Sequence, residues 1–163
     1  MNYQKKIIPL LFFISVVNFC SAQPGPGQQA MEIALPSTTG DTLKLSSLKG
    51  KIVLLDFWAS WCGPCRAANK HLVKLYSKYK DKGFEILSVS LDEENKQWKK
   101  AIAKDKMIWL HVTDGNGFYG KTAEGWGINA IPTSYLVNKE GILVGMDLIG
   151  KELENAIKDL LAK

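Results

Sequence analysis

The sequence predicts an α/β fold in which helices flank a mixed central sheet. Three observations predict it. Apolar runs of strand length alternate with stretches of helical periodicity, a four-residue turn joins two strands near the C-terminus, and neither an internal repeat nor a second domain breaks the order. With 46% apolar and 23% charged residues among 163, the chain can form one domain with a full core.

The first 22 residues predict a secretory signal peptide. Lys5 and Lys6 precede an apolar run from Ile7 to Phe19, and Cys20-Ser21-Ala22 offers a small-residue cleavage site. The run is too short to span a bilayer comfortably. Cleavage after Ala22 would remove Cys20 and leave two cysteines. We therefore expect the folded domain beyond the inner membrane, in the periplasm or cell envelope, where disulfides persist.

Two other fates of this segment stay open. Cys20 could carry a lipid after lipoprotein processing, although the bulky Phe19 before it fits such processing poorly. The segment could also remain as an uncleaved anchor. Both alternatives still place the folded domain outside the inner membrane.

After the signal peptide, the sequence predicts a linker and then a hairpin. Residues 23–30 are rich in Pro, Gly and Gln, which is typical of a flexible linker, so the folded domain is expected over 31–163. Met31 to Leu35 and Thr42 to Leu45 alternate apolar and polar residues around the turn signal Gly40-Asp41. This pattern predicts a short hairpin.

The middle of the chain predicts strands and helices in alternation. Residues 51–59 form an apolar run of strand length, and residues 64–81 have helical periodicity. The residues expected on the buried face of that helix are Ala68, Leu72, Leu75, Tyr76 and Tyr79. The elements expected next are a strand over 84–91, a helix near 94–105, a strand over 109–112 and a short helix around 117–125.

The C-terminal part predicts two strands and a final helix. Thr133 to Val137 and Ile142 to Leu148 are joined by residues 138–141, a turn short enough to force an antiparallel pair. The last helix is indicated by apolar residues at helical spacing, namely Leu153, Ile157, Leu160 and Leu161.

Trp61-Cys62-Gly63-Pro64-Cys65 lies between the strand at 51–59 and the helix at 64–81. Cys62 is therefore expected at a helix N-terminus, where unpaired N–H groups and the positive end of the helix dipole favour a thiolate. Pro64 suits the first turn because it lacks an N–H that would go unbonded there. The spacing brings Cys65 close enough to form a disulfide with Cys62, which predicts a redox-active dithiol.

A zinc site and a purely structural disulfide are less consistent with the cysteine pair. A structural zinc site needs four ligands, and the rest of the chain offers only Cys20, His71 and His111, at spacings that no zinc module uses. A structural disulfide closing so short a loop would contribute little stability. We expect neither a metal site nor a bound cofactor.

The charge of the chain does not indicate nucleic-acid binding. The formal charge is +5, and without Lys5 and Lys6 the 19 basic and 16 acidic residues leave +3. Lysines such as Lys70, Lys74 and Lys78 are scattered along a helix surface and form no dense run.

Two motifs make the chain resemble a known family. The run from Asp56 to Cys65 and the later run Trp126 to Thr133, which contains Ile131-Pro132-Thr133, resemble thioredoxin-fold proteins, and more narrowly the exported TlpA/ResA-like thiol–disulfide oxidoreductases. The resemblance covers about residues 31–162. It implies a thioredoxin-like fold in which the N-terminal hairpin belongs to this group and the helix at 94–105 and the strand at 109–112 are an inserted segment.

Two neighbouring groups fit less well. Peroxiredoxins share the outline but place their reactive cysteine in a Thr-x-x-Cys context, which Ala59-Ser60-Trp61-Cys62 does not match. The copper chaperones of the group carry cysteines separated by three residues and a distant histidine, whereas two residues separate Cys62 from Cys65.

The resemblance implies roles for the site residues. Cys62 is expected to attack as the thiolate and Cys65 to resolve the mixed disulfide. Ile131-Pro132 is expected to be a cis peptide that presents the Ile131 backbone to an extended substrate. Other residues expected to form the substrate groove are Trp61, Gly63, Pro64, Ile149 and Gly150.

Asp56 has two possible roles. It lies inside an apolar strand six residues before Cys62, where it could be the proton acceptor for Cys65 or a core residue with a hydrated head group. Burial would raise its pKa towards the working range of a general base. Trp58 is expected in the core, and His71 and His111 receive no role.

The resemblance implies an exported thiol–disulfide oxidoreductase that reduces disulfides in other proteins. Its electrons would come from a membrane-embedded thiol donor, and we expect a monomer. Cytochrome c maturation, thiol repair and envelope stress are all roles found in the family. A disulfide oxidase or isomerase is the alternative within the same chemistry. A metallochaperone that holds copper with the same cysteine pair is the alternative from another class.

Overall fold

The computed structural model describes residues 23–163, so the expected signal peptide, lipid site and anchor lie outside the described residues. The strands are β1 Ala34–Pro36, β2 Thr42–Lys44, β3 Ile52–Trp58, β4 Phe84–Ser90, β5 Leu110–Thr113, β6 Thr133–Val137 and β7 Leu143–Met146. The helices are α1 Gly63–Tyr79, α2 Asn95–Asp105, α3 Lys121–Gly125 and α4 Gly150–Leu161. Short 3₁₀ turns occupy Leu45–Leu48, Lys80–Lys82 and Gly117–Tyr119. The α/β class is confirmed.

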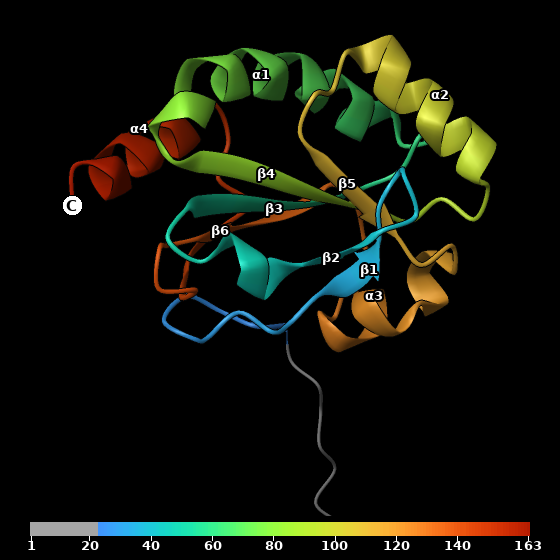
Figure 1. Ribbon diagram of the computed structural model, residues 1–163, viewed down its shortest axis with the longest axis horizontal. Coiled ribbons are helices and arrows are strands. Elements are labelled where there is room, and N and C mark those ends of the chain that lie inside the picture. Colours follow the sequence, from blue (N-terminus) through green and yellow to red (C-terminus); the bar gives the residue numbers. More distant parts are fainter. Residues whose placement is uncertain (1–22) are drawn as a thin grey trace, which may run out of the picture.

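The central sheet is mixed, as expected. Its strand order is β5-β4-β3-β6-β7, with β3, β4 and β5 parallel and β6 antiparallel to both β3 and β7. Strands β1 and β2 form the separate antiparallel hairpin that the N-terminal alternation predicts. Helices α1, α2 and α4 cover one face of the sheet, and α3 and the hairpin lie on the other (Figure 1).

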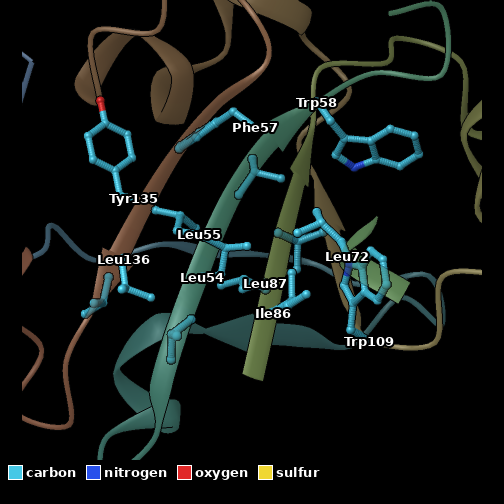
Figure 2. Packing of buried hydrophobic residues seen from close by; sticks show 14 of the residues in the cluster. Leu54, Leu55, Phe57, Trp58, Leu72, Ile86, Leu87, Trp109, Tyr135 and Leu136 are labelled. Carbon is cyan, nitrogen blue, oxygen red and sulfur yellow. The ribbon is translucent and has the colours of Figure 1, made fainter. Parts of the chain in front are cut away.

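Strand β3 is the centre of the core, and all seven of its residues are buried. Alternate side chains enter opposite layers: Figure 2 shows Phe57 on the same side of the sheet as Tyr135, and Trp58 on the other side. The Phe57 and Tyr135 rings meet edge to face, with centroids 6.3 Å apart. Because β3 ends at Trp58, this well-packed strand leads directly into the segment that carries the cysteines.

The buried face of helix α1 keeps four of the five residues expected there and adds Cys65 and Asn69. Ala68 is exposed, and Asn69 is buried in its place. The Asn69 amide is satisfied inside the protein, because its Nδ2 donates a hydrogen bond of 2.9 Å to Asp105 Oδ2 at the end of α2. Periodicity of apolar residues could not reveal a polar residue buried by a partner on another helix.

The segment 23–30 differs from the flexible linker expected there. Its backbone pairs with the β7 region through Gly27 N to Leu143 O at 2.7 Å, Leu143 N to Gln28 O at 2.9 Å and Ala30 N to Gly141 O at 2.9 Å. Strand β7 lies at the edge of the sheet and has free backbone groups for such pairing. The Pro, Gly and Gln content of residues 23–30 predicts flexibility, because amino-acid composition cannot show that a distant edge strand is available for pairing.

Within residues 23–163, no helix has the length and apolarity needed to cross a bilayer. In the same part of the chain, no group of three or more His, Cys, Asp or Glu residues is arranged to hold a metal ion.

Candidate active site

Cys62 and Cys65 form a disulfide at the start of α1, with their Cα atoms 5.3 Å apart. Cys62 is the N-cap residue of the helix, and its Sγ accepts a hydrogen bond of 3.2 Å from the Cys65 N–H. Cys65 is the more deeply buried, with 2% of its surface exposed against 6% for Cys62. A negative charge on the Cys62 sulfur would therefore be stabilised by the helix N-terminus and by this N–H.

Ile131 and Pro132 face the disulfide from the segment before β6. The peptide bond between them is cis, as the resemblance implies. The Ile131 carbonyl oxygen lies 3.9 Å from Cys62 Sγ. A backbone group that could pair with an extended peptide is thus placed beside the more accessible sulfur.

Asp56 is buried on β3, on the face of the sheet that α1 covers. Ser88 on β4 is its register partner and donates a hydrogen bond of 2.9 Å to its Oδ2. Burial raises the pKa of Asp56 to about 6, and the hydrogen bond from Ser88 opposes part of that rise. The carboxyl group can therefore exchange a proton near neutral pH, which suits either direction of general acid–base work.

The sequence analysis did not identify Ser88 and Trp109, which form a hydrogen-bonded chain with Asp56. The Ser88 hydroxyl donates to the carboxylate and accepts a hydrogen bond of 2.8 Å from Trp109 Nε1, so the three side chains form one buried chain of hydrogen bonds. The sequence holds a signal for Ser88, because a serine in the middle of an apolar strand needs a buried partner.

A hollow of about 340 Å³ connects Asp56 with the expected groove residues Pro132, Ile149 and Gly150. The other residues that line it are Leu54, Ala68, His71, Leu72, Ser134, Asp147, Leu148 and Leu153. Ile149 stands at its rim with 77% of its surface exposed. The hollow is a route by which water or a substrate side chain can reach the buried carboxyl group.

Trp61 is placed apart from this hollow. It is 60% exposed, and its ring centroid lies 6.3 Å from that of Phe118, in the segment before α3. Gly63 and Pro64 are exposed between the cysteines. The predicted groove residues therefore do not line a single pocket.

The remaining residues considered from the sequence lie outside the reactive centre. Trp58 is fully buried, as expected for a core residue. His71 is exposed on α1 at the edge of the hollow. His111 is buried on β5, where burial lowers its pKa to about 4 and keeps it neutral at physiological pH.

Comparison with known proteins gives a consistent result. Residues 26–146 match the AhpC/TSA family. The thiol-disulfide oxidoreductase ResA of Bacillus thuringiensis subsp. konkukian is 30% identical over 137 residues, which cover 84% of this chain and 77% of that protein. ResA of Bacillus subtilis is 29% identical over 135 residues, covering 83% and 73%.

Solved structures give the same result for the fold. The C-terminal domain of a thiol-disulfide oxidoreductase from Bacteroides thetaiotaomicron superposes with a TM-score of 0.82 and 33% identity, covering 86% of this chain and 99% of that one. A thiol:disulfide interchange protein DsbE from Chlorobium tepidum has a TM-score of 0.72 and 32% identity, covering 85% and 96%.

Proposed function

Because the chain belongs to the AhpC/TSA family of thioredoxin-fold proteins and is a ResA-like thiol–disulfide oxidoreductase, we propose that it is exported and reduces disulfides of envelope proteins. The observation that carries the proposal is the Cys62–Cys65 pair at the N-terminus of α1, facing the Ile131 carbonyl.

The proposed reaction has two exchange steps. In the reduced protein, the Cys62 thiolate attacks one sulfur of a substrate disulfide, and the other substrate sulfur leaves as a thiolate and takes a proton. Cys65 then gives its proton to Asp56 and attacks Cys62 Sγ. The second substrate thiol is released and the Cys62–Cys65 disulfide forms. Two electrons have passed from the protein to the substrate.

Reduction is the direction supported by the residues between the cysteines. Gly63-Pro64 is the dipeptide of thioredoxins, whose reduction potential is about −270 mV, whereas the oxidant DsbA lies at about −120 mV. A reductase must be reduced again after each turnover, so the proposal includes a membrane-embedded thiol donor. Redox titration against glutathione tests the direction: a potential near that of thioredoxin supports it, and one near that of DsbA indicates an oxidase or isomerase.

Location and substrates can be tested together in the native host. A Cys65→Ser variant should retain its substrates as mixed disulfides on Cys62, because no second thiol resolves them. Mass spectrometry of the purified adducts would identify the trapped proteins and the N-terminus of the mature chain. Envelope proteins on Cys62 and an N-terminus at Gln23 are expected. A lipid on Cys20 or cytoplasmic adducts would contradict the proposed processing or location.

A further inference from the structure

Ser60, two residues before Cys62, is held through all of its polar atoms. Its N–H donates a hydrogen bond of 2.8 Å to Asp92 Oδ2, and its hydroxyl donates to Asp92 Oδ1. Its carbonyl oxygen accepts a hydrogen bond of 3.0 Å from Arg66 Nη1. One carboxylate and one guanidinium group thus fix the backbone from which Trp61 and Cys62 extend.

Asp92 is itself rigidly placed. It follows β4, is only 3% exposed, and its Oδ2 accepts a further hydrogen bond of 2.7 Å from the Ser90 hydroxyl. A buried carboxylate is costly unless several donors satisfy it, and here three hydrogen bonds do so. Two of the three come from Ser60, so the turn before the dithiol is the main partner of this charge.

Arg66 is held from the other end of the same segment. Its Nη2 donates a hydrogen bond of 2.7 Å to Asp105 Oδ1, and its Nε pairs with Asp105 Oδ2. Asp105 is the last residue of α2 and also accepts from Asn69. The Arg66 backbone N–H donates a hydrogen bond of 3.0 Å to the Cys62 carbonyl oxygen. Arg66 is therefore a residue of the first turn of the helix that Cys62 caps.

Helix α2 lies alongside the end of α1 that carries the cysteines (Figure 1). Residues 92–105, here called the α2 segment, begin with Asp92 and end with Asp105. The Asp92 carboxylate binds Ser60 directly, and the Asp105 carboxylate acts on Ser60 through Arg66. We propose that Asp92 is a positioning residue for thiol–disulfide exchange, and that the α2 segment aligns Cys62 with the incoming disulfide through Asp92 and the Arg66–Asp105 pair. The proposal rests on the proposed function.

Positioning and simple charge have different consequences. A carboxylate acting only through its charge would disfavour the Cys62 thiolate, so its removal would lower the thiol pKa and reduce the reactivity of the thiolate only by about threefold per pKa unit. A carboxylate that aligns the turn sets how well the sulfur is placed for attack, and a displacement of about 1 Å can cost up to about a hundredfold in rate. Reactivity measured when Cys62 is entirely thiolate separates the two.

The test is the single-turnover reaction of reduced protein with excess insulin, followed to the pH at which the rate becomes constant. Asp92→Asn is expected to lower this limiting rate constant at least about tenfold, and Ser60→Ala, which removes one of the two bonds to Asp92, about threefold. Glu93→Gln removes the neighbouring exposed carboxylate, which makes no hydrogen bond within residues 23–163, and is the matched control. Circular dichroism and urea unfolding establish that each variant is folded.

A limiting rate constant of folded Asp92→Asn within twofold of Glu93→Gln would overturn the proposal, whatever happens to the thiol pKa. If Asp92→Asn does not fold, the Ser60→Ala result decides, and a wild-type rate there would overturn it equally. The proposed function is judged separately by the wild-type protein, which must reduce insulin for these comparisons to be made.

Discussion

Asp56 is both a buried residue of the core and the proposed proton acceptor of the reaction. The carboxyl group lies among apolar side chains of β3 and α1, yet it borders the hollow that reaches the cis-proline segment. The hydrogen bond from Ser88 stabilises its ionised form, and burial favours its neutral form. The balance between these two effects sets the pH at which the group can act as a base.

We predict that Asp56→Asn abolishes one pH dependence of stability. The pKa of Asp56 is raised from 3.8 to about 6 in the folded protein, so the folded state binds this proton more tightly than the unfolded chain does. The free energy of unfolding of the oxidised wild type should fall by about 2 kcal/mol as pH rises from 4 to 6. Urea unfolding of both proteins across this range measures the difference, which the variant should lack.

The same variant tests the role of Asp56 in exchange. Asp56→Asn should slow insulin reduction at pH 7 by about tenfold or more, since general-base assistance is lost. Ser88→Ala should keep the activity but move the inflection of its pH profile upward, because the carboxylate loses its hydrogen bond. Unchanged turnover of Asp56→Asn between pH 6 and 8 would make Asp56 a core residue only.

Helix α1 shows at the scale of elements what sequence can and cannot predict. The position of its first turn can be predicted from Cys62 and Pro64. The apolar runs on either side of it predict the ends of the neighbouring strands to within two or three residues. Asn69, Arg66 and Asp92 could not be assigned, because each is defined by a partner from a distant element. Hydrogen bonds and ion pairs between distant elements depend on the tertiary structure, so the periodicity of a single helix cannot predict them.

The N-terminus of α1 predicts a division of labour between the cysteines. In the reduced protein, iodoacetamide at neutral pH should modify Cys62 well before Cys65, because Cys62 caps the helix and is the more exposed. Cys62→Ser should abolish insulin reduction without forming an adduct. Cys65→Ser should lose turnover and accumulate a mixed disulfide. Peptide mapping by mass spectrometry gives the order of alkylation, and Cys65 reacting first would contradict the activating effect of the helix terminus on Cys62.

At the scale of the whole molecule, the segment 23–30 closes one edge of the sheet. Its backbone bonds to Gly141 and Leu143 cover part of β7, and the Gln23 side chain donates a hydrogen bond of 2.8 Å to the Gly127 carbonyl. An edge strand covered in this way is protected from pairing with other chains. The segment thus joins the β6–β7 hairpin to the region just before the cis proline.

Removal of residues 23–30 should therefore destabilise the domain. The three backbone hydrogen bonds to Gly141 and Leu143 contribute about 0.5–1.5 kcal/mol each, so a chain that begins at Met31 should lose about 2–4 kcal/mol in its free energy of unfolding. Gln29→Ala is the control, because it removes only a side-chain bond to the Gly141 carbonyl and should cost less than about 1 kcal/mol. Urea unfolding at pH 7 measures both. If the shortened chain is as stable as the full domain, residues 23–30 are the flexible linker that their composition suggests, and the pairing along β7 does not contribute to the fold.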